Sequence, residues 1–185
     1  MVLKFCMEQI DYTGRELTAH FAYRNFNMAG DSLVAFCGKC NVRKENLVDL
    51  EDVKENSFIF SRSMLHFIGE FFDNDLEKTV LKQRLLMAVI KDELVDRSRV
   101  SIMRDGDDLY DGESKLSVSI ATITPVSTMI HAGINIISES TPVKTKGLDD
   151  YGIEAKSFAE SVLQKFDEEM KSVIFARCKV RGVSY

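Results

Sequence analysis

The sequence predicts a single α+β domain over residues 1–185, with a mostly antiparallel sheet and helices chiefly on one face. Short apolar segments with strand-like alternation come in pairs, and longer segments with helical periodicity separate them at irregular intervals. The length of 185 residues is enough for one sizeable core and short for two. Apolar residues make up 45% of the chain and charged residues 29%, which is the balance of an ordinary soluble globular protein.

The N-terminal part is expected to contain two strands and one helix. Residues 2–10 read as a first strand, and residues 11–14 as a turn, because Gly14 can adopt a positive φ. A helix is expected over 15–26, where apolar side chains share one face. Residues 32–37, which read Ser-Leu-Val-Ala-Phe-Cys, form a strong strand pattern.

Two helices are expected in the middle of the chain. Ser61 or Ser63 can cap the first, which extends to Phe72 and carries enough apolar side chains for a buried helix. The second covers 76–95 after a capping Asp75 and has the clearest helical periodicity of the chain. Its apolar residues follow one stripe, and lysine and glutamate occupy the remaining surface.

The C-terminal part is expected to contain a strand pair and a long helix. A short strand over 98–103 precedes an acidic, turn-rich segment. Residues 115–124 alternate apolar and polar side chains, and 129–137 follow as the partner strand. Residues 154–176 form a long amphipathic helix, and 178–183 are expected to pair as a last edge strand.

Charge and hydropathy exclude several classes of function. The net charge is −5, with 24 basic and 29 acidic residues, which argues against nonspecific binding of nucleic acid. No segment approaches the roughly 18–20 apolar residues that span a bilayer. The first residues do not resemble a signal peptide, so a cytoplasmic protein with reduced thiols is expected. The four cysteines are too few for a disulfide scaffold in a chain of this size.

Lys115 is the strongest candidate for a functional residue, because it heads an apolar strand directly after an acidic turn. A partly desolvated ammonium at that position can polarise a carboxylate or a phosphate. The alternative is a solvated lysine at the shoulder of a hairpin. Asp107 and Asp108 precede it in the turn. These two carboxylates can bind Mg²⁺ with a nucleotide, or they simply form the turn.

His131 lies on the partner strand with Gly133 and Asn135 on the same face. Gly133 leaves room for a ligand or for another backbone. The alternative for His131 is a core histidine bonded to a carbonyl. His20 and His66 also lie in apolar segments, both expected to be helical. Convergence of the three histidines would make a metal or proton-transfer site, and separate burial of each is the simpler alternative.

Two further groups of residues are candidates of lower weight. Cys37 and Cys40 form a CxxC pair that is half of a zinc ribbon or a redox motif, although it ends a strand rather than opening a helix. Arg24 and Asp31 flank the end of the first helix. They belong either to a helix end and its loop or to the polar edge of the same pocket.

The segment 104–137 resembles the catalytic half of the biotin and lipoate protein ligases and lipoyl transferases. In that superfamily a lysine begins a strand after a turn rich in Asn and Asp, and a glycine-containing strand pairs beside it. The resemblance implies that Lys115 contacts the acyl group and phosphate, that Asp108 is the acidic turn residue, and that Gly133 and Asn135 lie on the neighbouring strand. The glycine-rich loop of that superfamily has no counterpart here, and the small residue after Lys-x-Ser is Val118.

Nearly the whole chain is similar to the uncharacterised prokaryotic family called domain of unknown function 366. The segments that carry this similarity are Tyr12–His20, Gly30–Phe36, Ser63–Phe67 and Asp111–Gly112. Membership would imply an α+β fold and a homo-oligomer, and it supplies no known reaction or cofactor.

Three hypotheses of function follow. The first is an enzyme of the acyl-ligase or acyl-transferase type that binds a small molecule containing a carboxylate or a nucleotide. In it Lys115 stabilises negative charge, His131 or His20 is the general base, and Asp108 orients a group or binds metal. The second is a non-catalytic module of the same fold that binds a small molecule or forms an oligomer. The third is a metal- or thiol-dependent protein that uses the CxxC pair and the histidines.

Overall fold

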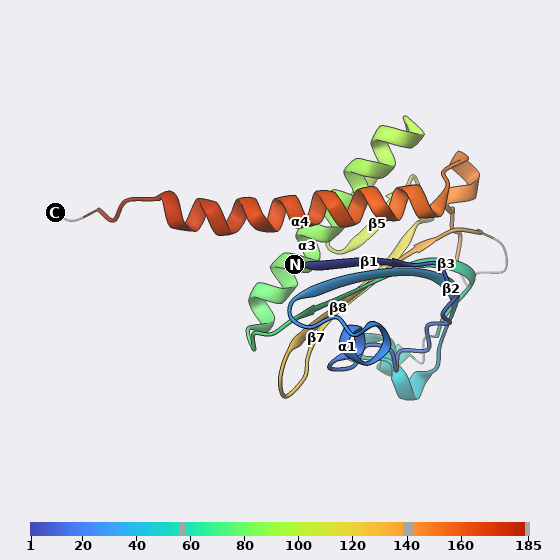
Figure 1. The fold of residues 1–185 in the computed structure, drawn as a ribbon. Coiled ribbons are helices and arrows are strands. Elements are labelled where there is room, and N and C mark those ends of the chain that lie inside the picture. The colour runs from blue at the N-terminus through green and yellow to red at the C-terminus, as the bar shows by residue number, and fades with distance from the viewer. Residues whose placement is uncertain (56–57, 139–142, 184–185) are drawn as a thin grey trace.

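The computed structural model describes residues 1–55, 58–138 and 143–183, and it has the expected α+β architecture. A five-stranded sheet has the order β1-β2-β3-β8-β7 (Figure 1). Only β1 and β2 pair in parallel; the other neighbours are antiparallel. The strands are β1 (Val2–Cys6), β2 (Ser32–Val42), β3 (Ile59–Phe71), β7 (Ser117–Ile123) and β8 (Thr128–Asn135).

Helices α3 (Leu76–Ser98) and α4 (Ala155–Lys179) cover one face of this sheet (Figure 1). A smaller three-stranded sheet, β4 (Met103–Asp105), β5 (Asp108–Asp111) and β6 (Ser114–Lys115), follows α3. The opposite face of the large sheet carries only short elements. These are α1 (Phe21–Phe26), η1 (Lys44–Asn46) and α2 (Leu50–Glu55), and a further turn, η2 (Leu148–Tyr151), precedes α4.

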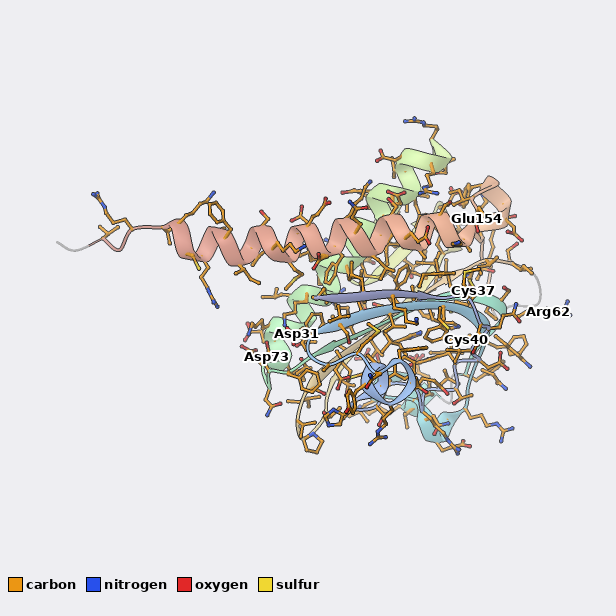
Figure 2. All side chains as sticks on the ribbon, in the orientation of Figure 1. Asp31, Cys37, Cys40, Arg62, Asp73 and Glu154 are labelled. Atoms are coloured by element: carbon orange, nitrogen blue, oxygen red, sulfur yellow. The ribbon has the colours of Figure 1, made fainter. Side chains whose placement is uncertain are left out.

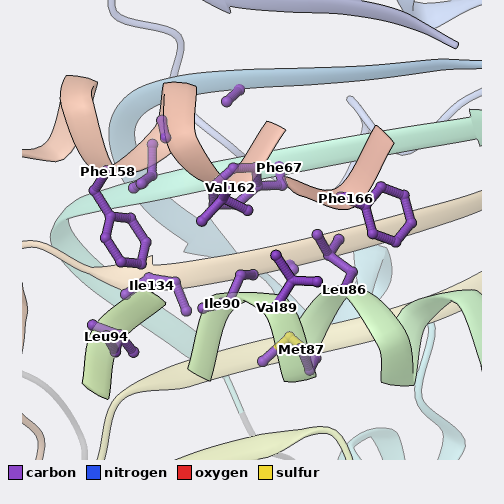
Figure 3. Close-up of a cluster of buried hydrophobic side chains, with 14 of the residues drawn as sticks. Phe67, Leu86, Met87, Val89, Ile90, Leu94, Ile134, Phe158, Val162 and Phe166 are labelled. Atoms are coloured by element: carbon purple, nitrogen blue, oxygen red, sulfur yellow. The ribbon is translucent and has the colours of Figure 1, made fainter. Parts of the chain in front are cut away.

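The sheet separates two apolar cores. Figure 3 shows the larger one, where side chains of α3 and α4 interlock above the sheet. Leu86, Ile90, Phe158 and Phe166 are fully buried there. The smaller core lies on the other face and includes Met64. No helix of the described residues is long and apolar enough to cross a membrane.

The clearest error of the sequence analysis is the helix predicted from Ser61 or Ser63 to Phe72, because this segment is strand β3. Strand β3 is central in the sheet and pairs with β2 on one side and β8 on the other. Its two faces contribute to the two cores, so apolar side chains lie on both faces of the strand. A strand buried on both faces has no alternation, and its periodicity does not distinguish it from a buried helix.

Other boundaries also differ from the sequence-based expectation. The helix expected over 15–26 is shorter in the structure. It begins only at Phe21, because His20 directly before it adopts a left-handed conformation with φ 64°. The strand expected over 98–103 is wrong for most of that range, because α3 continues to Ser98 and β4 begins only at Met103. The edge strand expected over 178–183 is wrong, since α4 continues to Lys179. The helix over 76–95 and the strand pair over 115–137 are confirmed, and the side chain of Asp75 caps α3 as expected by accepting a hydrogen bond from the Lys78 amide.

Candidate functional site

A pocket with a volume of about 330 Å³ opens beside the start of strand β7, on the sheet face that α3 and α4 leave uncovered. The connection between β2 and β3 contributes one wall, and the acidic hairpin of the small sheet contributes the other. The lining combines apolar and polar side chains. The apolar lining is Phe58, Ile59, Phe60, Met64, Val118 and Val143; the polar lining is Asp49, Asp52, Asp107, Asp108, Lys115, Ser117, Ser119, Asn135 and Thr145.

Lys115 lines this pocket where β6 leads into β7. Its ammonium Nζ donates a hydrogen bond to Oδ2 of Asp108 at 2.8 Å, and the two side chains are 30% and 27% exposed. The Lys115 amide donates to the carbonyl oxygen of Lys144 at 2.9 Å, so the backbone is held as well. A half-buried ammonium with a single carboxylate counterion is a group that can exchange that counterion for an oxygen of a ligand.

Asp107 has a structural role that the sequence did not reveal. Its carboxylate accepts hydrogen bonds from Gln83 Nε2 at 2.8 Å, from Arg84 Nη1 at 2.9 Å and from Ser119 Oγ at 3.0 Å. These bonds tie the acidic turn to α3 and to β7. Asp107 is therefore occupied by the scaffold, whereas Asp108 is paired only with groups of its own hairpin in the bonds described here.

The pocket carries more negative than positive charge, because four aspartates and one lysine line it. Partial burial raises the pKa of Asp52, and the neighbouring Asp49 raises it further, while Lys115 opposes both effects. Desolvation is the larger cause of this raised pKa, and the negative charge of the neighbouring carboxylates adds to it. An anion that enters must therefore be attracted by Lys115 strongly enough to offset that negative charge.

His131 and His66 form a buried pair behind this pocket. Nδ1 of His66 and Nε2 of His131 lie 3.0 Å apart, and the ring of Tyr12 stacks on His131 with 3.7 Å between centroids. Burial lowers the pKa of His66 to about 3, which the nearby backbone of Gly38 opposes only in part. Burial and the charge of His66 lower the pKa of His131 as well. Both imidazoles are therefore neutral near pH 7 and share one proton in their hydrogen bond.

The histidine pair reaches the same hollow as Lys115. His131 lines a second, smaller pocket of about 60 Å³. This pocket shares five wall residues with the larger one, so the two are adjoining lobes of one hollow. The shared residues are Asp49, Asp52, Ile59, Val118 and Ser119. His66 does not line either lobe and acts on the hollow through His131.

Gly133 and Asn135 lie on β8 beside the hollow. A Cβ atom at Gly133 would lie 2.4 Å from Sδ of Met64, so the space that glycine leaves is filled by a methionine side chain rather than by an open cavity. Asn135 is 5% exposed and lines the larger lobe. Its Nδ2 donates weakly to the carbonyl oxygens of Lys115 and Lys146, at 3.5 and 3.4 Å.

Three of the expected site residues lie away from the hollow. His20, Arg24 and Asp31 line neither lobe. The His20 amide donates to Oε1 of Glu70 at 2.7 Å, and Asp31 accepts from the Phe72 amide at 2.9 Å. These contacts lie at the Phe71 end of β3, whereas His66 lies near the middle of the strand, so the structure does not bring the three histidines together.

The two cysteines of the CxxC motif point to opposite faces of the sheet. Cys37 packs on the core beneath α4, and Cys40 belongs to the other core (Figure 2). An irregularity of the strand lies between Gly38 and Cys40. Burial raises the pKa of both thiols, that of Cys40 to about 12. Because the two thiols lie in different cores, the geometry does not support the zinc or redox interpretation of this pair, and the described residues contain no group of three or more metal-binding side chains.

Sequence reasoning also missed residues that shape the hollow. Asp49 and Asp52 belong to a polar segment whose position near Lys115 follows only from the tertiary fold. Tyr12, which stacks on His131, entered the sequence analysis only as part of a family motif. For Asp49 and Asp52, the one available signal was their Asp-x-x-Asp spacing, which on a helix puts two carboxylates on the same side.

The arrangement of strands and helices can be compared with that of solved proteins. A biotin protein ligase of Aquifex aeolicus superimposes with a TM-score of 0.60 and 14% identity, over 92% of this chain and 69% of that one. A candidate lipoate protein ligase of T. acidophilum, solved with bound lipoic acid, gives a TM-score of 0.61 and 13% identity, over 92% and 86%. At such low identity these similarities show the fold alone, which is that of the biotin and lipoate ligases.

The chain belongs to the family described as Domain of unknown function (DUF366), which matches residues 1–181. An uncharacterised protein of Methanocaldococcus jannaschii is 40% identical over 159 residues, which cover 83% of this chain and 72% of that protein. A solved protein of unknown function from Pyrococcus horikoshi is 39% identical, with a TM-score of 0.91 over 98% of both chains.

Proposed function

We propose that this protein binds a small molecule at Lys115, in a pocket of the acyl-ligase or acyl-transferase type. The observation that carries the proposal is the placement of the Lys115 ammonium at the wall of a 330 Å³ pocket, with Asp108 as its counterion at 2.8 Å. An ammonium in that setting contacts a carboxylate or carbonyl oxygen and stabilises negative charge on it.

The lining favours a ligand with an apolar body and one small polar head. Phe58, Phe60 and Met64 supply the apolar surface, and the head meets Lys115 and Asp108. A carboxylate replaces Asp108 as the counterion of Lys115, so it adds one negative charge at most. A nucleotide polyphosphate adds several, and among these aspartates it would need Mg²⁺ to balance its charge. A simple carboxylic acid or its ester therefore fits the pocket better than a free nucleotide.

His131 is the imidazole that lines the adjoining lobe, and in this proposal it contacts the ligand as a neutral ring, because burial lowers its pKa. Its hydrogen bond to His66 fixes the orientation of the ring, and the stacked Tyr12 holds it from the other side. Asp108 positions the Lys115 ammonium. His20 has no part in the proposal, because it lies outside both lobes.

The test is ligand binding by the wild-type protein and by Lys115→Ala, measured by thermal shift and by calorimetry. Lipoate, biotin, octanoate and ATP with Mg²⁺ are the probes. We expect at least one carboxylic acid to stabilise the wild-type protein and Lys115→Ala to bind it roughly tenfold or more weakly. Lys156→Ala is the matched control, because Lys156 lies on α4 across the sheet from the pocket. Binding that survives unchanged in Lys115→Ala would overturn the proposal.

A second candidate function is a binding module without catalysis. The observation in its favour is that residues 43–58, which connect β2 and β3 beside the pocket, contain no glycine and contribute Asp49 and Asp52. A polyphosphate cradle needs flexible backbone and free N–H groups there instead. Release of pyrophosphate on incubation with ATP, Mg²⁺ and a bound acid would favour the ligase, and binding without any turnover would favour the module.

A further inference from the structure

The two lobes of the hollow follow one face of strand β8. Asn135 lines the larger lobe, and His131 lines the smaller one. Gly133 lies between them on the same face, because residues two apart on a strand point to the same side. Gly133 itself lines neither lobe. Another side chain therefore covers the strand at the point where the two lobes would otherwise join.

The side chain that covers Gly133 is that of Met64. Met64 lies on β3 opposite Asn135, so it is a diagonal neighbour of Gly133 across the strand pair. A Cβ atom at Gly133 would lie 2.4 Å from Sδ and 3.3 Å from Cγ of Met64. Met64 is buried and lines the larger lobe. Its thioether thus ends the larger lobe above Gly133, before the part of the strand that carries His131.

Val118 confines the same place from the neighbouring strand. It pairs with Gly133 across β7 and β8, and its Cγ2 would lie 3.2 Å from a Cβ atom at Gly133. Val118 lines both lobes, whereas Met64 lines the larger one only. A β-branched valine is stiff, whereas a methionine side chain is unbranched, flexible and adapts its shape. Met64 is therefore the side chain that can yield when a ligand enters or when a neighbour is changed.

We propose that Met64 determines how long an apolar body the hollow accepts. With its carboxylate at Lys115, the ligand extends along the sheet face, and its far end meets the Met64 thioether above Gly133. A longer body reaches the space beside His131 only by displacing that thioether, which weakens its binding. This role rests on the proposed function, because it takes Lys115 as the anchor of the carboxylate.

The first test measures the affinity of straight-chain saturated acids, from butanoate to dodecanoate, for the wild-type protein and for Met64→Ala by calorimetry. Alanine lacks the Cγ, Sδ and Cε atoms of methionine, so the preferred acid should become longer by about three carbon atoms. Acids longer than the wild-type optimum should bind about tenfold more tightly to Met64→Ala, because their last methylene groups become buried.

Met87→Ala is the matched control for this change. Met87 is also a buried methionine, but it lies in the core on the other face of the sheet. Met87→Ala should therefore keep the chain-length preference of the wild-type protein, whatever stability it loses. Thermal melting of each variant checks that the fold is retained. If Met64→Ala does not fold, Met64→Val takes its place and should give a smaller shift in the same direction.

Gly133→Ala tests the contact from the other side. The added Cβ atom would displace the sulfur of Met64, and a flexible thioether has room to move into the larger lobe that it lines. The preferred acid should then become shorter than that of the wild-type protein. The double variant with Met64→Ala leaves the new Cβ atom unopposed, and its preference should lie between those of the two single variants.

The failure of this role and the failure of the proposed function give different results. If no acid binds to the wild-type protein or to any variant, the proposed function is wrong and the role of Met64 falls with it. If acids bind in a way that Lys115→Ala abolishes, but Met64→Ala and Met87→Ala keep the same chain-length preference, only the role of Met64 is overturned. A preference that becomes longer in Gly133→Ala would overturn it equally.

Discussion

Nδ1 of His66 and Nε2 of His131 lie 3.0 Å apart between two central strands, with no carboxylate in the contact. Across β3 and β8 these residues are diagonal neighbours, because His66 pairs with Gly133 and Ile68 with His131. One N–H joins the two neutral rings at this contact, and a further proton would put a charge into the core.

The first prediction concerns acid stability. The pKa of both histidines is lowered in the folded protein, so below about pH 6.5 the unfolded state binds more protons and stability falls with pH. Between pH 7 and pH 5.5 the free energy of unfolding should fall by about 2 kcal/mol, because a histidine contributes up to about 1.4 kcal/mol per pH unit. Urea unfolding at each pH measures this slope.

Two sets of variants test whether the buried histidine pair causes this slope. His66→Phe with His131→Phe should flatten the slope over that range, whatever its absolute stability. His20→Ala should keep the wild-type slope, because its ring lies outside the buried pair. A double variant with the full wild-type slope would show that other groups titrate.

The second prediction concerns Gly38. A Cβ atom at this position would lie 1.9 Å from the carbonyl oxygen of Ile10, so backbone must move to admit any other residue. Gly38→Ala should lower the free energy of unfolding by about 3 kcal/mol or more. Gly182→Ala is the control, since nothing lies within 4 Å of a Cβ there. Chemical denaturation distinguishes them, and equal stabilities would contradict the close approach.

The third prediction concerns Asp107. Asp107→Ala removes the acceptor shared by Gln83 and Arg84 and leaves the buried Gln83 amide without that partner. The expected loss is about 1–3 kcal/mol, because a partly exposed charged network contributes less than a buried one. The exposed Asp105→Ala should change stability by less than about 0.5 kcal/mol. A similar loss in both variants would show that Asp107 does not anchor the acidic turn.

The fourth prediction concerns the charge of the pocket and depends on the proposed function. Asp52→Asn removes one of four carboxylates around Lys115. A carboxylic acid ligand should bind about threefold to tenfold more tightly, since one repulsive charge at close range is lost. The affinity of the uncharged methyl ester of the same acid should not change. Calorimetry at low and high salt measures both, and an equal effect on acid and ester would exclude an electrostatic cause.

Patterns in the chain itself determined the helical and paired-strand parts of the fold. The stripe of residues 76–95 predicted α3, and the alternation of 115–124 beside 129–137 predicted the pairing of β7 with β8. These elements have one buried and one solvated face, so their periodicity is visible in the sequence. Lys115 could be selected for the same reason, because a lone charge at the head of an apolar strand stands out.

Only the tertiary structure decided the rest. Strand β3 is buried on both faces, so its sequence looks like that of a buried helix until its neighbours are known. The hollow combines Asp49 and Asp52 with Lys115 and His131, which are far apart along the chain. Conversely, Cys37 and Cys40 are close in sequence, but their side chains lie on opposite faces of the sheet. Distances along a chain predict local periodicity, whereas sites depend on which faces the sheet brings together.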